Sequence, residues 1–168
     1  TINRPFKEVK MFEIGDKVVY PMHGAGIVVN IDIKEVLGEE RKYYILRMPI
    51  NGMRVMVPVE NAKELGVRYI YGPAEMNKVF ETLKDDAEED LPSNWNRRYR
   101  FNMERIKSGD LTEIAKVVRC LTKMDEEKTL STGERKLLNN AKQIIISEMA
   151  LVYDKSVSEI DSLVEKAI

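Results

Sequence analysis

The stretch Val67–Leu83 reads VRYIYGPAEMNKVFETL, and its two ends follow different hydrophobic patterns. Residues 67–70 form a short β-branched and aromatic run, which is typical of a strand. After Gly72, Pro73 stands where a helix begins, and from Met76 onward apolar residues recur at i, i+3, i+4 and i+7. This change of period predicts an α+β protein, with strands before residue 72 and helices after it.

The chain before Gly72 is predicted to form a small antiparallel β-barrel. Short alternating runs are separated by Gly and Pro turns at roughly 8–12-residue spacing, and Asn51-Gly52 is a strong hairpin signal. We expect a polar turn at 37–40 and a single helical turn at 61–66. The expected strands cover residues 18–20, 27–33, 42–48, 53–58 and 67–70.

The chain after Gly72 is predicted to be a compact bundle of about five helices. A helix from about residue 93 to 107 is followed by capping boxes that begin at Asp110, Ser131 and Ser156. The acidic run 85–90 is interpreted as a solvated hinge or linker. We therefore divide the chain into an arm or non-native remnant (residues 1–10), a β domain (11–71) and a helical domain (72–168).

The composition limits the classes of function. Of 168 residues, 43% are hydrophobic and 33% charged, as in a soluble globular protein, and the net charge of −1 excludes a generic polyanion binder. A single cysteine precludes an internal disulfide and favours the cytoplasm. No apolar run approaches the ~20 residues of a membrane span.

The sequence contains no convincing catalytic or metal site. His23 is the only histidine and lies in a Gly-rich turn, and Cys120 is the only cysteine, so they cannot form a ligand cluster. Cys120 falls off the apolar stripe of its helix and is interpreted as an ordinary free thiol. We expect no enzyme activity, no cofactor and no metal.

A basic and aromatic helix is the first candidate binding surface. Trp95 is the only tryptophan, and the chain between positions 95 and 123 contains eight basic residues and three acidic residues. Segregated charge of this kind suits nucleic acid. At 100° per residue, however, Trp95 shares an apolar stripe with Tyr99, Met103 and Ile106, which favours a buried indole. Because Trp95 lies in the first turn, where the stripe can extend past the bundle, both alternatives stay open.

The run Met53–Val57 is the second candidate surface. It could be an edge strand that a partner sheet extends, with Arg54 as its exposed member. From the residues alone, an internal hairpin is the preferred interpretation.

Several motifs in the same order resemble the CarD/CdnL family of bacterial transcription regulators. The resemblance spans Met11 to about Val164. It rests on the runs 12–26 (FEIGDKVVYPMHGAG), 57–62 (VPVENA), 94–100 (NWNRRYR), 108–110 (SGD), 117–119 (VVR) and 130–135 (LSTGER).

The resemblance implies that the β half is a Tudor-like module that docks on the β-subunit lobe of RNA polymerase, partly by edge-strand pairing. The expected polymerase-binding residues are Lys34, Arg54, Val55, Met56 and Val57. Met56 departs from the family pattern, because some relatives carry an arginine there, and Arg54 on the same strand face could compensate.

For the helical half, the resemblance implies DNA contact. The tryptophan matched by Trp95 wedges into the minor groove at the upstream edge of the transcription bubble. Basic residues matched by Arg97, Arg100 and Arg135 lie near the phosphates, and Arg98 belongs to the same basic run.

We therefore expect a monomeric transcription regulator that binds RNA polymerase and promoter DNA, largely without sequence preference, and stabilises the open complex. The alternative is a cytoplasmic protein–protein adaptor with a buried Trp95 and no DNA contact.

Overall fold

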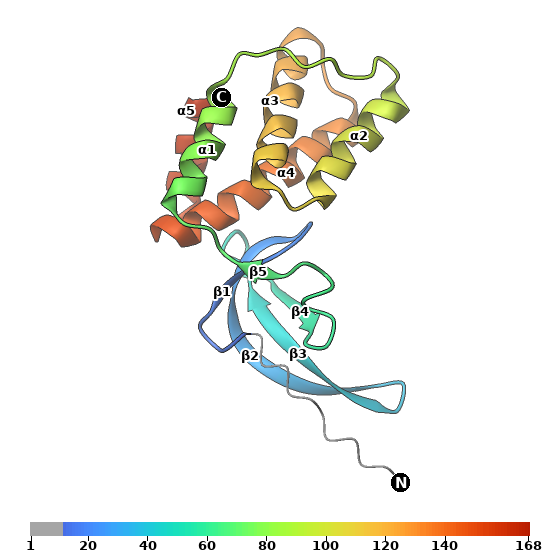
Figure 1. Cartoon of the computed structure of the whole chain (residues 1–168), viewed down its shortest axis with the longest axis vertical. Helices are drawn as coiled ribbons and strands as arrows, with labels where there is room; N and C mark the ends of the chain where they lie inside the picture. Colours follow the sequence, from blue (N-terminus) through green and yellow to red (C-terminus); the bar gives the residue numbers. More distant parts are fainter. Residues whose placement is uncertain (1–11) are drawn as a thin grey trace.

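The computed structural model describes residues 12–168, in which a five-stranded antiparallel sheet precedes five α-helices (Figure 1). This arrangement confirms the predicted α+β class. The arm or remnant expected at residues 1–10 lies outside the described residues.

The sheet has the strand order β4-β3-β2-β1-β5, and every neighbouring pair is antiparallel. The strands are β1 Lys17–Tyr20, β2 Gly24–Val36, β3 Glu39–Arg47, β4 Arg54–Pro58 and β5 Arg68–Tyr69. The β2–β3 hairpin is longer than predicted, because only Leu37 and Gly38 form its turn, with φ of 53° and 78°. Residues 61–66 form the single turn that was predicted, in which the N–H of Leu65 donates to the carbonyl of Asn61 at 2.8 Å and Gly66 ends the turn with a φ of 79°.

The helices begin at caps that are visible in the sequence. They are α1 Pro73–Lys84, α2 Trp95–Lys107, α3 Leu111–Glu127, α4 Thr132–Tyr153 and α5 Val157–Ala167. Side-chain oxygens of Asp110, Ser131 and Ser156 accept backbone N–H groups of the first turns, which confirms the three predicted helix starts. Asn94 caps α2 in the same way. Within residues 12–168, none of the helices has the length and apolar character needed to cross a membrane.

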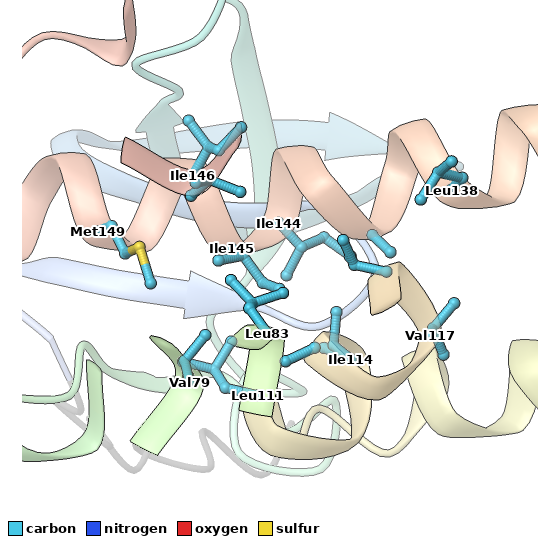
Figure 2. Close-up of a cluster of buried hydrophobic side chains, with 14 of the residues drawn as sticks. Val79, Leu83, Leu111, Ile114, Val117, Leu138, Ile144, Ile145, Ile146 and Met149 are labelled. Carbon is cyan, nitrogen blue, oxygen red and sulfur yellow. The ribbon is translucent and has the colours of Figure 1, made fainter. Parts of the chain in front are cut away.

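The core of the helical half lies between α1, α3 and α4. Figure 2 shows Val79 and Leu83 of α1, Ile114 of α3, and Ile145 of α4 pointing toward one another, and all four side chains are buried. Helix α1 is therefore part of the bundle.

Helix α4 lies across the sheet and joins the two halves (Figure 1). Ser147 Oγ accepts the N–H of Ala25 at 2.9 Å, and a Cβ on Gly24 would lie 2.6 Å from this oxygen, so only glycine fits there. Glu148 is 0% exposed. Its carboxylate accepts two hydrogen bonds from Arg68, at 2.9 and 3.0 Å, and one from the N–H of Tyr71 at 2.8 Å. Buried polar contacts therefore connect the sheet to the bundle.

Candidate nucleic-acid interface

Trp95 is the first residue of α2, at the edge of the helical bundle. The Asn94 cap accepts the N–H of Arg97 at 3.1 Å and so sets where the helix begins. Further along the same helix, Ile106 is buried and Tyr99 and Met103 pack on the core. Trp95 itself remains 42% exposed. The apolar stripe therefore extends past the bundle at its first residue, and the indole is not buried.

The indole of Trp95 is held by residues of α2 and α4. Its Nε1–H donates to Ser131 Oγ at 2.9 Å. Its ring stacks on Tyr99 with centroids 5.3 Å apart and an interplanar angle of 19°. A Cβ on Gly133 would lie 3.2 Å from Cζ2 of the indole. The side chain is thus exposed and yet fixed in orientation.

Arg97 and Arg100 are the predicted phosphate contacts that the structure leaves available. Both are exposed, and among residues 12–168 neither has an acidic partner. They lie in the first two turns of α2, on the same helix as Trp95. The first two turns of α2 therefore carry one exposed indole and two exposed guanidinium groups that have no acidic partner among the described residues.

Arg98 occupies a different environment from its neighbour Arg97. Its Nε donates to Glu134 Oε1 at 2.7 Å, and Glu134 is buried. Its Nη1 also donates to the carbonyls of Pro92 and Ser93. These contacts connect the start of α2 to α4. The guanidinium of Arg98 therefore binds groups of the protein itself.

Arg135 is exposed, but it is paired with Asp125. The two guanidinium nitrogens donate to the carboxylate at 2.7 and 3.3 Å. The hydrogen bonds from Arg135 and from the N–H of Leu130 hold the pKa of Asp125 below its usual range. A phosphate that binds Arg135 has to compete with this carboxylate.

Much of the positive charge counted between residues 95 and 123 is neutralised internally. We call residues 85–92 the acidic segment; it runs between α1 and α2 along the outside of the bundle (Figure 1). Glu89 pairs with Arg105 at 2.7 Å and with Arg119 at 3.4 Å. Lys123 donates to the carbonyl of Asp86. The interpretation as a solvated linker is therefore wrong for Glu89, although the segment does connect two helices.

The acidic segment also covers Cys120. Cys120 is a free thiol, as predicted, but it is buried, and the thiol donates to Glu89 Oε2 at 3.3 Å. Burial is the main cause that raises the pKa of the thiol, and the hydrogen bond to Glu89 raises it further. Burial by itself would raise the pKa of Glu89, but the hydrogen bonds from Arg105 and Cys120 and the charge of Arg119 together lower it.

The predicted polymerase-binding strand, β4, lies at one edge of the sheet and pairs with β3. The preference for an internal hairpin is therefore wrong. Arg54 and Met56 are exposed on one face of β4, Val55 is half-buried, and Val57 is fully buried. Val57 can therefore offer only main-chain groups to a partner.

Lys34 lies well away from Arg54. It pairs with Arg41 at one end of β3, whereas Arg54 pairs with Arg47 at the other end. Six residues of strand separate these positions by about 20 Å. The predicted polymerase-side residues therefore extend along the sheet instead of forming one compact patch.

The sequence did not identify Ser131 and Gly133 as residues of this site. The run 131–134 was interpreted as a helix start and as part of a family motif, and neither interpretation links Ser131 or Gly133 to Trp95. Its proximity to Trp95 joins residues 36 positions apart, which no local pattern encodes. In the part of the chain that the structure describes, no three His, Cys, Asp or Glu side chains are placed to hold a metal ion.

Comparisons with known proteins match both halves. Residues 12–70 match the family model described as "CarD-like/TRCF RID domain", and residues 78–165 match "CarD, C-terminal domain". A Bacillus subtilis protein named "Putative transcription factor YdeB" is 38% identical over 152 residues, which is 90% of this chain and 99% of that protein. The solution NMR structure of the 72-residue N-terminal domain of Myxococcus xanthus CarD is 40% identical and covers 34% of this chain and 77% of that chain, with a TM-score of 0.31.

Proposed function

Because the chain belongs to the CarD family of transcription factors, we propose that it acts on transcription by bridging RNA polymerase and promoter DNA. The resemblance drawn from the sequence motifs is confirmed at the level of the family, whose members are transcription factors and not enzymes. In this proposal the β half docks on the β-subunit lobe of the polymerase. The helical half contacts DNA at the upstream edge of the transcription bubble.

The observation that carries the DNA side of the proposal is the exposed indole at the bundle edge. A distorted base step exposes apolar surface, and a flat aromatic side chain can cover it and hold the step open. Arg97 and Arg100 are exposed on the first two turns of the same helix and have no acidic partner among the described residues. Each phosphate they neutralise adds about −0.9 to the slope of log K against log salt.

The other two predicted DNA contacts take altered roles in the proposal. Arg98 supports the wedge by joining α2 to Glu134 of α4, and it does not reach phosphates. Arg135 contributes to DNA binding only when a phosphate displaces Asp125.

On the polymerase side, the outer edge of β4 supports docking by strand addition. Main-chain groups of β4 would pair with a partner strand, and the side chains of Arg54 and Met56 would contact its surface. Lys34 would meet a second part of the polymerase, farther along the hairpin. Docking raises the local concentration of DNA for a weak second site.

The effect on transcription follows from differential binding. If the protein binds the open complex more tightly than the closed complex, the population of the open complex rises. A difference of about 1.4 kcal/mol shifts this equilibrium about tenfold. The mechanism needs no cofactor and uses one copy of the chain.

The exposed indole favours this function over the alternative, an adaptor that contacts only proteins. That alternative places Trp95 inside the bundle, and at 42% exposure the side chain is half outside it.

The proposal is tested by the lifetime of promoter open complexes with the parent protein, Trp95→Ala and Phe101→Ala. Phe101 is a matched control, since it is an exposed aromatic residue on another face of the same helix. We expect Trp95→Ala to shorten the lifetime about tenfold, toward that of polymerase alone, because the distorted step loses its apolar cover. Phe101→Ala should keep the parent lifetime, and both variants should co-purify with polymerase.

A Trp95→Ala variant that prolongs the open complex as well as the parent does would remove the wedge from the proposal. Loss of polymerase binding in the same variant would show that the effect does not arise at DNA.

A further inference from the structure

The indole of Trp95 is exposed, and yet its single polar atom already makes a hydrogen bond within the protein. An indole has a single hydrogen-bond donor, and here Nε1–H donates to Ser131 Oγ at 2.9 Å. The same oxygen accepts the N–H of Glu134 at 3.2 Å as the N-cap of α4. Both acceptor positions of this hydroxyl are therefore occupied, one by the helix and one by the tryptophan.

We propose that Ser131 is a positioning residue for the Trp95 wedge, which it holds in one orientation with only carbon atoms of the indole facing DNA. This inference rests on the proposed function, because it concerns how the same side chain is prepared for contact. It assigns Ser131 a role beyond capping α4.

The first argument concerns what the indole can offer to DNA. The minor groove presents acceptors on both A·T orientations, and a free Nε1–H could donate to them. With Ser131 as its partner, the indole has no donor left for base edges. Its contact with a distorted step is then apolar stacking, which every base can provide.

The second argument concerns the cost of ordering. A freely rotating exposed side chain loses conformational freedom when it binds. Here the hydrogen bond to Ser131 and the stacking on Tyr99 at 5.3 Å restrict the ring before DNA arrives. Gly133 leaves room for this orientation, since a Cβ there would lie 3.2 Å from the indole. The wedge is therefore preorganised by the start of α4.

The test uses Trp95 as its own reporter, because it is the only tryptophan in the chain. Ser131→Ala removes the hydroxyl, and Ser131→Thr keeps a hydroxyl at the same position. Ser156→Ala is a matched control. Ser156 caps α5 in the same way, by accepting the N–H of Glu159 at 3.1 Å, but it does not contact Trp95.

For Ser131→Ala we expect lower fluorescence anisotropy, stronger acrylamide quenching and an open-complex lifetime shortened severalfold, with polymerase binding unchanged. Ser131→Thr keeps the hydroxyl, so its fluorescence anisotropy, acrylamide quenching and open-complex lifetime should all equal those of the parent. Ser156→Ala should leave fluorescence and lifetime at parent values, even if its thermal stability falls by as much as that of Ser131→Ala.

Two results would overturn the inference. Unchanged anisotropy and quenching in Ser131→Ala would show that the hydroxyl does not hold the ring. Altered fluorescence with a parent lifetime would show that orientation does not matter for function. If Trp95→Ala itself leaves the lifetime unchanged, the proposed function fails and this inference fails with it, whereas a Trp95→Ala effect without a Ser131→Ala effect removes only the inference.

Discussion

Trp95 is exposed because of where α2 begins. A helical stripe faces the core only along the length that a neighbouring element covers, and the first residue of α2 lies where that cover ends. The neighbour that does reach it, the start of α4, contacts the edge of the ring through Ser131. One side of the indole is thereby fastened while 42% of the residue stays open to solvent.

Arg97 and Arg98 illustrate how adjacent residues of the same charge diverge. Successive side chains on a helix differ by 100° in direction, so Arg98 turns toward α4 and meets buried Glu134, while Arg97 turns outward. A buried carboxylate needs a cation and hydrogen bonds, and Arg98 supplies both. Charge composition alone therefore overstates the basic surface.

At Arg135, we predict that Asp125→Asn strengthens binding to fork-junction DNA. The change removes the negative charge that Arg135 now pairs with and keeps an oxygen for the N–H of Leu130. The freed guanidinium can then neutralise a phosphate, so the slope of log K against log salt should steepen by about 0.9. Fluorescence anisotropy of labelled DNA at several salt concentrations measures this.

Glu126→Gln is the control for Asp125→Asn, because Glu126 is exposed next to it and also loses one negative charge. An equal gain in both variants would attribute the effect to net charge instead of to Arg135. The gain should also disappear in the double variant Asp125→Asn, Arg135→Ala.

At the scale of elements, the acidic segment is a structural part of the helical half. Glu89 lies between Arg105 of α2 and Arg119 of α3, and Arg119 also donates to the carbonyl of Thr82 near the end of α1. One extended segment thus ties three helices together. Its carboxylate at Glu89 also pairs with Arg105 and Arg119, whose charges would otherwise extend the DNA-facing surface.

We predict that Glu89→Gln exposes Cys120 to alkylation. The variant loses charge-assisted bonds to two arginines, each of which contributes about 1.5–3 kcal/mol, so transient opening of the segment should become at least about tenfold more frequent. The rate of iodoacetamide modification, followed by mass spectrometry, measures this opening. Glu88→Gln is the control, since Glu88 is exposed one residue away.

A modification rate that is the same in Glu89→Gln and Glu88→Gln would contradict this account of the segment. The pH dependence offers a second check. Because the pKa of Glu89 is lowered in the folded protein, its stabilisation is fully present above the usual value of 4.5 and is lost as the pH falls through the lowered pKa. The unfolding midpoint of Glu89→Gln should therefore depend less on acidification than that of the parent.

At the scale of the whole molecule, the contacts of α4 with the sheet decide whether the two halves act together. Ser147 and Glu148, consecutive residues of α4, bind the sheet through Ala25 and Arg68. Lys17 of β1 adds a hydrogen bond to the carbonyl of Leu151 at 3.2 Å. A polymerase-docked β half would thereby hold Trp95 at a set position relative to the DNA.

We predict that Glu148→Gln uncouples the two halves and lowers the free energy of unfolding by about 3 kcal/mol, because it leaves Arg68 without its charge partner in a largely buried site. Urea unfolding monitored by Trp95 fluorescence reports the helical half, and far-ultraviolet circular dichroism reports the whole chain. The two transitions should coincide in the parent and separate in the variant.

Glu165→Gln is the matched control for Glu148→Gln, since it breaks the exposed pair with Lys142. Exposed pairs contribute little, so coincident transitions near the parent midpoint are expected. If the two transitions also coincide in Glu148→Gln, the coupling between α4 and the sheet does not depend on this carboxylate.

Local patterns were sufficient to predict the class of fold and most of its elements. The change of hydrophobic period at Gly72, the hairpin signal at Asn51-Gly52 and the caps at Asp110, Ser131 and Ser156 all act within a few residues. Strand and helix periods and capping bonds are short-range effects, so one sequence displays them directly. The family was recognisable for a similar reason, because its motifs are contiguous runs.

The contacts that make a surface available or unavailable were beyond such patterns. Arg98 with Glu134, Glu89 with Arg105, and Trp95 with Ser131 each join residues that are far apart in the chain. Whether a charge is free or an indole exposed depends on which distant element packs beside it. Helical periodicity showed which residues share a face with Trp95, and packing against α4 set how much of that face remained open.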